Sequence, residues 1–198
     1  MSPRGRPRAF DREKVLAEAM HVFWERGYEG ASLAELTAAM GINPPSLYAA
    51  FGGKESLFRE ALELYGVTDG QYTARALREQ PTARASVEAM LRDNARAYCE
   101  PGHPTGCMVV LAATNYTGAS QGVHDYVAEL RAATKDKLRK RLRQGVEEGE
   151  LAEDADVGAL ATFYTTVLHG LSLQARDGAD RAELDRAIDL AMASWPRP

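Results

Sequence analysis

Apolar residues recur at helical spacing along almost the whole chain, and this pattern is the strongest constraint on its fold. Between Val157 and Leu171 they fall three or four positions apart, as on one face of an α-helix. No stretch shows the sustained alternation of a β-strand, and no Asn-Gly or Asp-Gly pair joins two β-branched runs. The sequence therefore predicts an all-α fold of about nine helices.

Length and composition narrow the class of protein further. The chain has 198 residues and a formal net charge of −4, with 45% hydrophobic and 26% charged residues, which is ordinary for a globular protein. Two cysteines are too few to hold together a secreted fold of this size, and residues 1–8 lack the apolar core of a signal peptide. The longest apolar run, Cys107–Ala113, is far shorter than the roughly 20 residues of a membrane span. We expect a soluble, cytoplasmic protein with no membrane partner.

Positive charge is concentrated at the N-terminus. Through Lys14 there are five basic and two acidic side chains, a net charge of +3, so the remainder of the chain carries −7. Arg4, Arg6 and Arg8 alternate with glycine and proline, which disfavour a helix, and this predicts a flexible basic arm over residues 1–10. Such an arm suits the minor groove of DNA, although a solvated terminus has the same composition.

Short-range signals predict the first two helices. Asp11 is a candidate N-cap for a helix that ends near Gly27, where glycine favours a left-handed C-terminal residue. Ser32 and Glu35 form the pattern of a capping box, in which each side chain accepts a hydrogen bond from the other residue's backbone N–H. The second helix is short and ends at Gly41.

The second and third predicted helices meet in a tight turn at Gly41, which is the arrangement of a helix-turn-helix. Asn43 is a candidate N-cap for the third helix, and Pro44 occupies its first position, where a missing N–H costs nothing. This helix is short, breaks at Gly52 and presents small outward residues, as a helix that enters the major groove requires. The candidate DNA-binding residues on and beside it are Asn43, Pro44, Pro45, Ser46, Tyr48, Ala49 and Lys54, with Arg4, Arg6 and Arg8 of the arm.

Residues 11–57 resemble the DNA-binding domain of the TetR/AcrR family of transcriptional regulators. The resemblance implies an all-α homodimer with a three-helix DNA-binding head (11–57) and a ligand-binding and dimerisation domain (58–198). It also implies a repressor that a small-molecule effector releases from a palindromic double-stranded DNA operator. The positions that carry the resemblance are Val15, Leu16, Ala19, Phe23, Gly27, Tyr28, Ala31, Ser32, Leu36, Gly41, Ile42, Asn43, Leu47, Tyr48, Phe51, Lys54 and Glu55.

The resemblance assigns roles to three side chains of the head. Ser32 would cap the second helix and contact a phosphate, and Tyr48 and Lys54 would each contact a phosphate beside the reading helix. The family often has an aromatic residue or histidine at positions 49 and 50, where this chain has two alanines. Alanine contacts a thymine methyl group but hydrogen-bonds no base. We therefore expect few base contacts, Ser46 among them, and more reliance on the arm and on DNA shape.

The resemblance places the effector pocket among helices within residues 82–149 and the dimer interface in the last two helices. Helical spacing describes an ordinary intrachain core equally well, so each candidate has that alternative. The candidate pocket residues are Leu91, Tyr98, Cys107, Met108, Leu111, Tyr116 and Tyr126. The candidate dimer stripes are Leu160, Tyr164, Val167, Leu168 and Leu171 on one helix and Leu184, Ile188, Ala191 and Trp195 on the other.

Cys99, His103 and Cys107 share a regular spacing around a chain break at residues 101–104. If their side chains converge, they suit a soft metal ion or a thiol switch, so a metal- or redox-responsive repressor that senses through the two cysteines is the alternative function. A structural zinc site normally needs a fourth ligand, and the break makes the spacing uninformative. We assign no metal and no cofactor.

Two further patterns are less informative. The basic run Arg131–Arg143 has the spacing of a solvated face on a long helix. The chain contains neither the His-Glu-x-x-His motif of zinc proteases nor a phosphate-binding glycine loop. We therefore do not expect an enzyme.

Overall fold

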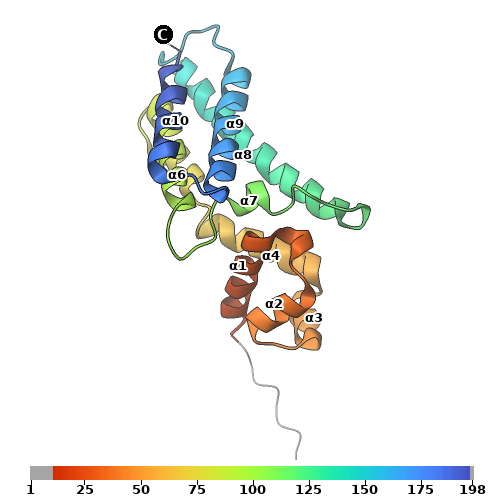
Figure 1. Cartoon of the computed structure of the whole chain (residues 1–198). Helices are drawn as coiled ribbons and strands as arrows, with labels where there is room; N and C mark the ends of the chain where they lie inside the picture. Colours follow the sequence, from red (N-terminus) through yellow and green to blue (C-terminus); the bar gives the residue numbers. More distant parts are fainter. Residues whose placement is uncertain (1–10, 197–198) are drawn as a thin grey trace, which may run out of the picture.

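The computed structural model describes residues 11–196, and over that range the chain is helical without a strand, as predicted (Figure 1). None of these helices combines the length and apolar character needed to cross a membrane. The arm residues Arg4, Arg6 and Arg8 lie outside the described residues. The helices are α1 (Arg12–Gly30), α2 (Leu33–Met40), α3 (Pro44–Phe51), α4 (Lys54–Val67), α5 (Tyr72–Glu79), α6 (Ala83–Tyr98), α7 (Met108–Leu111), α8 (Gln121–Glu147), α9 (Val157–Arg176) and α10 (Arg181–Ala193), with a short 3-10 turn, η1 (Gly118–Ser120), before α8.

The caps predicted for α2 and α3 are confirmed. Ser32 and Glu35 form the complete capping box, and Gly41 ends α2 in the left-handed conformation with φ 64°. The Asn43 carboxamide oxygen accepts a hydrogen bond from the Ser46 backbone N–H at 2.9 Å, and Pro44 begins α3. Local hydrogen bonds and a single left-handed glycine therefore account for the helix-turn-helix.

Two elements of the body differ from the expected ones. The apolar helix expected over residues 105–116 shrinks to α7, and α5 was not predicted. Gly106 explains the late start of α7, because it has φ 77° and a Cβ there would lie 2.7 Å from the Ser172 carbonyl oxygen of α9. This segment is shaped by a neighbour distant in sequence. For α5, two glycines at positions 66 and 70 obscured the signal of a short helix.

The buried side chains form two clusters, one centred on α1–α4 and one on α6, α9 and α10. These two groups of helices lie at opposite ends of the molecule (Figure 1). The first joins α1–α4 to α7 and the N-terminal part of α8, including Val123 and Val127. The second joins α5, α6, α9 and α10 to the later part of α8, including Leu138 and Leu142. Helix α8 thus contributes to both clusters. The domain boundary predicted after residue 57 falls inside α4, which continues to Val67.

The stripes predicted as dimer faces require a correction, because most of their side chains are buried within the chain. Helix α9 packs against α6, α8 and α10, and this contact covers its most regular apolar face. Its outward face carries Phe163 and Leu173, and α10 presents Leu190, which is 77% exposed. Buried residues of the predicted stripes are Tyr164, Leu168, Leu171, Leu184, Ile188 and Ala191, whereas Leu160, Val167 and Trp195 are partly buried against the same cluster.

Candidate DNA-binding and effector sites

Helix α3 has the two faces that a reading helix needs. Leu47 and Phe51 are buried against the head, which holds the helix in place. On the opposite side the Tyr48 side chain is 51% exposed. The other exposed candidates around it are Asn43, Pro44, Pro45 and Ala49, with Ser46 half-buried. The structure thus brings the predicted reading residues together on one accessible surface, and their contact with DNA stays a prediction.

Lys54 and Ser32, the predicted phosphate contacts beside α3, are both engaged within the chain. The Lys54 ammonium lies 4.3 Å from the centre of the Tyr28 ring. Partial burial lowers the pKa of Lys54, and the nearby Glu29 carboxylate opposes that shift. The Ser32 hydroxyl donates to Glu35 at 2.7 Å. The predicted phosphate contacts would therefore compete with these internal partners.

A short segment around α7 is hydrogen-bonded to α1 at two points. The Trp24 indole N–H donates to the Gly106 carbonyl at 3.0 Å, and the Tyr28 backbone N–H donates to the Ala112 carbonyl at 2.7 Å. Gly27 makes the second contact possible, because its φ of 72° breaks α1 there and a Cβ would lie 3.1 Å from the Ala112 oxygen. Residues 106–112 are thereby fastened to the DNA-binding head.

The Glu29 carboxylate ties the same end of α1 to the start of α8. It accepts hydrogen bonds from the Ser120 hydroxyl and from the Thr117 backbone N–H. The Ser120 hydrogen bond is the main cause that lowers the pKa of Glu29. Residues 118–122 read Gly-x-Ser-x-Gly, the pattern of a hydrolase nucleophile elbow. Here Ser120 is buried in a 3-10 turn that does not follow a strand, so the structural context of a nucleophile elbow is missing. The Ser120 hydroxyl instead links the body to the head through its hydrogen bond to Glu29.

Two arginines add further links between head and body. Arg176, at the end of α9, donates to the Trp24 and Glu25 carbonyls of α1 at 2.7 and 2.9 Å. Arg59 of α4 donates to the Gly122 carbonyl at 3.1 Å and lies over the Tyr126 ring of α8. All of these links join the body to α1 or α4 of the head.

A cavity of about 210 Å³ lies among α4, α5, α6, α7, α8 and α9, directly behind the α7 segment. Burial raises the pKa of Tyr98 and of Tyr65 well above the usual value, and the Cys107 thiol beside them adds to both shifts. Both phenols are therefore protonated at neutral pH. The polar lining consists of Tyr65, Thr73, Asn94, Tyr98, Cys107, Arg131, Thr134, Lys137 and His169.

Of the seven predicted pocket residues, Tyr98 and Cys107 line this cavity and the other five do not. Leu91 and Met108 are fully buried in the two clusters, and Leu111 packs near Gly106. Tyr116 is exposed and stacks on His124, and Tyr126 lies under Arg59. The prediction missed Arg131, Lys137 and His169. The only signal for the first two was the basic run interpreted as a solvated helix face.

The two cysteines occupy different environments. Cys107 lines the cavity, whereas the Cys99 thiol approaches the Ala179 carbonyl at 3.7 Å, outside it. Burial raises the pKa of Cys99. His103 lies near Trp24 and Asp69. Within residues 11–196 no three His, Cys, Asp or Glu side chains gather in a way that holds a metal ion. The metal-sensing alternative therefore finds no support in this geometry.

Family models match both halves of the chain. Residues 15–61 match the model of bacterial regulatory proteins of the tetR family, and residues 83–191 match the tetracyclin repressor-like C-terminal domain. The chain belongs to the TetR family. The resemblance drawn from the head alone is confirmed, and the match extends through the body.

Relatives of this TetR-family chain include repressors of Escherichia coli K12. The helix-turn-helix-type transcriptional repressor ComR is 33% identical over 197 residues, which cover 98% of this chain and 92% of ComR. The repressor BdcR is 34% identical over 187 residues, covering 88% and 83% of the two chains. A solved cysteine mutant of the TetR-family regulator CifR, in complex with 26-base-pair operator DNA, is 50% identical with a TM-score of 0.93, covering 96% of this chain and all of that one.

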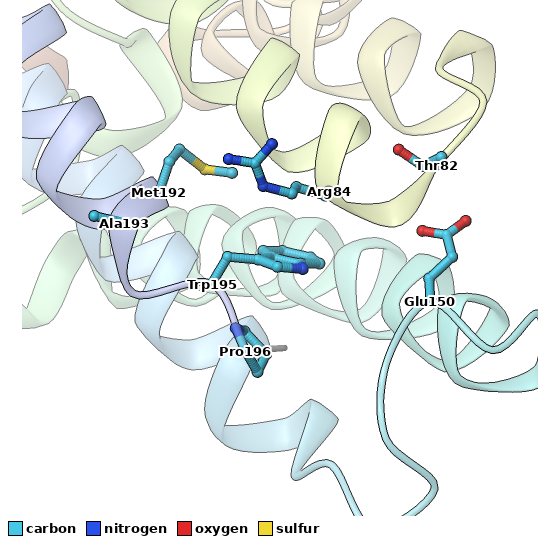
Figure 2. A pocket seen from close by; sticks show the side chains of 7 residues that line it. All are labelled: Thr82, Arg84, Glu150, Met192, Ala193, Trp195 and Pro196. Atoms are coloured by element: carbon cyan, nitrogen blue, oxygen red, sulfur yellow. The ribbon is translucent and has the colours of Figure 1, made fainter. Parts of the chain in front are cut away.

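The TetR-family body also has a groove near its C-terminus, at the end of the molecule far from the DNA-binding head (Figure 1), and Figure 2 shows the side chains that line it. Its side chains come from α6, α10, the chain after α10 and the loop after α8. Arg84 and Glu150 bring opposite charges to it, and Glu150 is already bonded to the Ala83 backbone N–H. The groove is open to solvent and is separate from the α7 segment. It is therefore a weaker candidate for the effector than the cavity lined by Tyr98.

Proposed function

We propose that this chain represses transcription by binding an operator as a homodimer and that a small molecule in the cavity behind α7 releases it. The observation that carries the DNA-binding part is the exposed face of α3, framed by Tyr48 and held by the confirmed caps. The likeness to an operator-bound CifR mutant supports the same surface. Relatives named as repressors support a regulatory rather than a catalytic role, and an operator as partner supports a location in the cytoplasm.

The dimer interface is formed by the outward faces of α9 and α10. Phe163, Leu173 and Leu190 are large apolar side chains left 43%, 50% and 77% exposed on these two helices. Gly170 on the same side of α9 has open space where a Cβ would stand, so another helix can approach closely. Apolar faces of two adjacent helices pair with a second copy to form a four-helix interface. Two heads then meet half-sites about 34 Å apart.

Release depends on the segment of residues 106–112. Its inner side contributes Cys107, Val109 and Val110 to the cavity, and its carbonyls at both ends accept hydrogen bonds from α1. A molecule that displaces this segment moves Trp24 and Tyr28, and with them the head. The effector must bind the displaced arrangement more tightly, since a ligand with equal affinity for both states shifts nothing.

A gel mobility-shift experiment with the chain's own promoter region tests the DNA site. Tyr48→Phe removes one phosphate hydrogen bond, worth about 1 kcal/mol, so operator affinity falls about fivefold. Lys54→Ala weakens operator binding and reduces the steepness of the plot of log affinity against log salt concentration by about one, because one fewer phosphate is neutralised. Val67→Ala, on the same helix as Lys54 but away from α3, is the control. Unchanged affinity in both variants would remove this surface from the DNA site.

The arm is tested in the same way. Replacing Arg4, Arg6 and Arg8 by alanine removes three cations proposed for the minor groove. Operator affinity falls, and the slope of log affinity against log salt concentration becomes less steep by up to about three. An identical salt dependence would show that the arm stays in solvent.

The presence of Cys107 in the cavity favours a redox signal as the second candidate. Peroxide oxidises a thiol by transferring one oxygen atom, which yields a sulfenic acid and water. Such a group beside Tyr65 and Tyr98 adds bulk where the effector would lie. Peroxide that weakens operator binding in the native chain but not in Cys107→Ser supports this signal. An equal loss of operator binding in the native chain and in Cys107→Ser excludes Cys107 as the redox sensor. The same measurement on Cys99→Ser shows whether the Cys99 thiol contributes.

A further inference from the structure

The cavity behind α7 has a one-sided electrostatic character. Its lining includes the cations Arg131 and Lys137 and the imidazole of His169, and none of its lining residues is Asp or Glu. The chain as a whole is acidic, with a formal net charge of −4. A cavity that gathers cations without carboxylates in an acidic protein is set up to receive negative charge.

Arg131 has one hydrogen-bond partner within the described residues, and that partner is neutral. Its guanidinium donates to the Val109 carbonyl at 3.1 Å, and among residues 11–196 no carboxylate comes within ion-pair distance of it. Desolvation lowers the pKa of Arg131. A half-buried guanidinium with five N–H donors and one neutral acceptor has donors left for a ligand.

Two other arginines in the body have more protein partners than Arg131, although each keeps one buried nitrogen, Nη1 of Arg141 and Nε of Arg176, without a hydrogen bond. Arg141, which is buried, lies 3.7 Å from the carboxylates of both Glu148 and Glu150 and donates to Ser86. Arg176 donates to two carbonyls of α1. These two arginines make their contacts outside the cavity, whereas Arg131 is the arginine of the cavity lining.

The remaining lining supplies neutral donors and an apolar wall. The phenols of Tyr65 and Tyr98 are protonated, whereas the amide nitrogen of Asn94 already donates to the Thr73 hydroxyl and to the Met90 carbonyl. Leu62, Leu130 and Leu168 line the cavity together with two valines of the α7 segment. The volume of about 210 Å³ is below the 300–1,000 Å³ typical of sites for drug-sized ligands, so the occupant is small.

We propose that this cavity binds a small amphipathic carboxylate, whose charged group pairs with Arg131 and whose hydrocarbon part lies against Leu62, Leu130 and Leu168. The proposal rests on the effector role proposed above and specifies its chemistry. It also gives that role a mechanism, because a carboxylate that binds Arg131 competes with the Val109 carbonyl. Weakening that bond frees the α7 segment, which holds α1 through Trp24 and Tyr28.

Thermal unfolding of the full chain without DNA tests the ligand chemistry. Three probes share one hydrocarbon chain: octanoate, neutral octanamide and cationic octylamine. We expect octanoate to raise the melting temperature and the other two to have little effect. Equal stabilisation by octanamide, stronger stabilisation by octylamine, or no effect of octanoate would overturn the proposal.

Three variants assign the effect to Arg131. Arg131→Gln removes a charge-assisted interaction and weakens octanoate binding by roughly 10- to 100-fold, measured by calorimetry. Arg131→Lys keeps the charge and retains the preference for octanoate over octanamide. Arg143→Gln, on the exposed side of the same helix, leaves binding unchanged. Full octanoate affinity in a folded Arg131→Gln variant would contradict the assignment.

The two proposals fail separately. Octanoate that binds through Arg131 but leaves operator binding intact in the gel-shift experiment contradicts release by this effector, while the carboxylate site stands. Operator affinity reduced in Tyr48→Phe, together with no octanoate binding, supports the DNA site and refutes the carboxylate site.

Discussion

The DNA-binding head and the cavity behind α7 are built in different ways. The turn and the outward face of the head depend on residues within about 25 positions of one another, from Ser32 to Lys54, through caps and two left-handed glycines, Gly41 and Gly52. The cavity draws its lining from α4 to α9, with more than 100 residues between Leu62 and His169. Local hydrogen bonds specify the first, whereas tertiary packing assembles the second.

The two regions therefore differ in how many residues constrain them. The head needs only that α3 be short, capped and held by Leu47 and Phe51. The cavity changes its chemistry whenever one inward residue of six helices changes. The α7 segment connects the two, because it lines the cavity and is hydrogen-bonded to α1.

The largest expected effect tests whether the body must pair for the head to work. Leu190→Glu places a charge in the proposed dimer face, so the protein becomes monomeric. Operator affinity falls at least about 100-fold, because one head loses the advantage of simultaneous binding. Sedimentation and gel shift measure both. Val67→Glu, at an equally exposed apolar residue outside this face, leaves the dimer intact, and a dimeric Leu190→Glu variant would refute the interface.

The next effect tests whether head and body unfold together. Phe58 is fully buried in the head, with ring centres 5.0 Å from Phe23 and 5.1 Å from Tyr28. Phe58→Ala lowers the free energy of unfolding by about 3–5 kcal/mol. Because α7 and α8 share this cluster, we expect one denaturation transition, shifted as a whole. Two transitions, only one of them shifted, would mean that the head is an independent unit.

Removing one helix N-cap in the head and one in the body compares the two regions with variants of equal expected loss of stability. Asn43 caps α3 in the head, and Thr82 caps α6 in the body by accepting from the Ala85 backbone N–H at 3.1 Å. Replacing either by alanine costs about 1 kcal/mol in denaturant unfolding. Only Asn43→Ala also weakens operator binding, since only that cap orients the reading helix. Equal operator affinity in the two variants would argue that α3 is positioned by packing alone.

The smallest effect concerns pH and the cavity. Burial lowers the pKa of His169 below its usual 6.5, and Arg131 adds to that shift. Between the lower pKa of His169 in the folded chain and about 6.5 in the unfolded chain, the imidazole is protonated only in the unfolded chain. The contribution of neutral His169 to folding stability is therefore complete above about pH 6.5 and declines as the pH falls below it. Unfolding of His169→Gln shows a weaker decline over the same range. An identical pH profile would place His169 in a more solvated setting.

The all-α fold, the helix-turn-helix and its caps could be predicted because neighbouring residues decide them. Ser32 with Glu35 and Asn43 with Ser46 satisfy backbone groups within one helical turn, so their spacing is legible in the chain itself. The dimer stripes were wrong for a related reason. Helical spacing shows that Tyr164 and Leu168 share an apolar face but not whether that face meets α6 or a second copy.

The sequence by itself determined the helices, the turn at Gly41 and the family of the chain. Tertiary structure alone decided that α7 is short, that Cys107 and Cys99 lie apart, and that Arg131 turns inward from a basic run. These features depend on contacts between distant segments, such as Gly106 against Ser172, whose geometry no local spacing records. Burial within the folded chain decides the role of a residue, whereas the spacing of residues along the sequence is the same whether a side chain is buried or exposed.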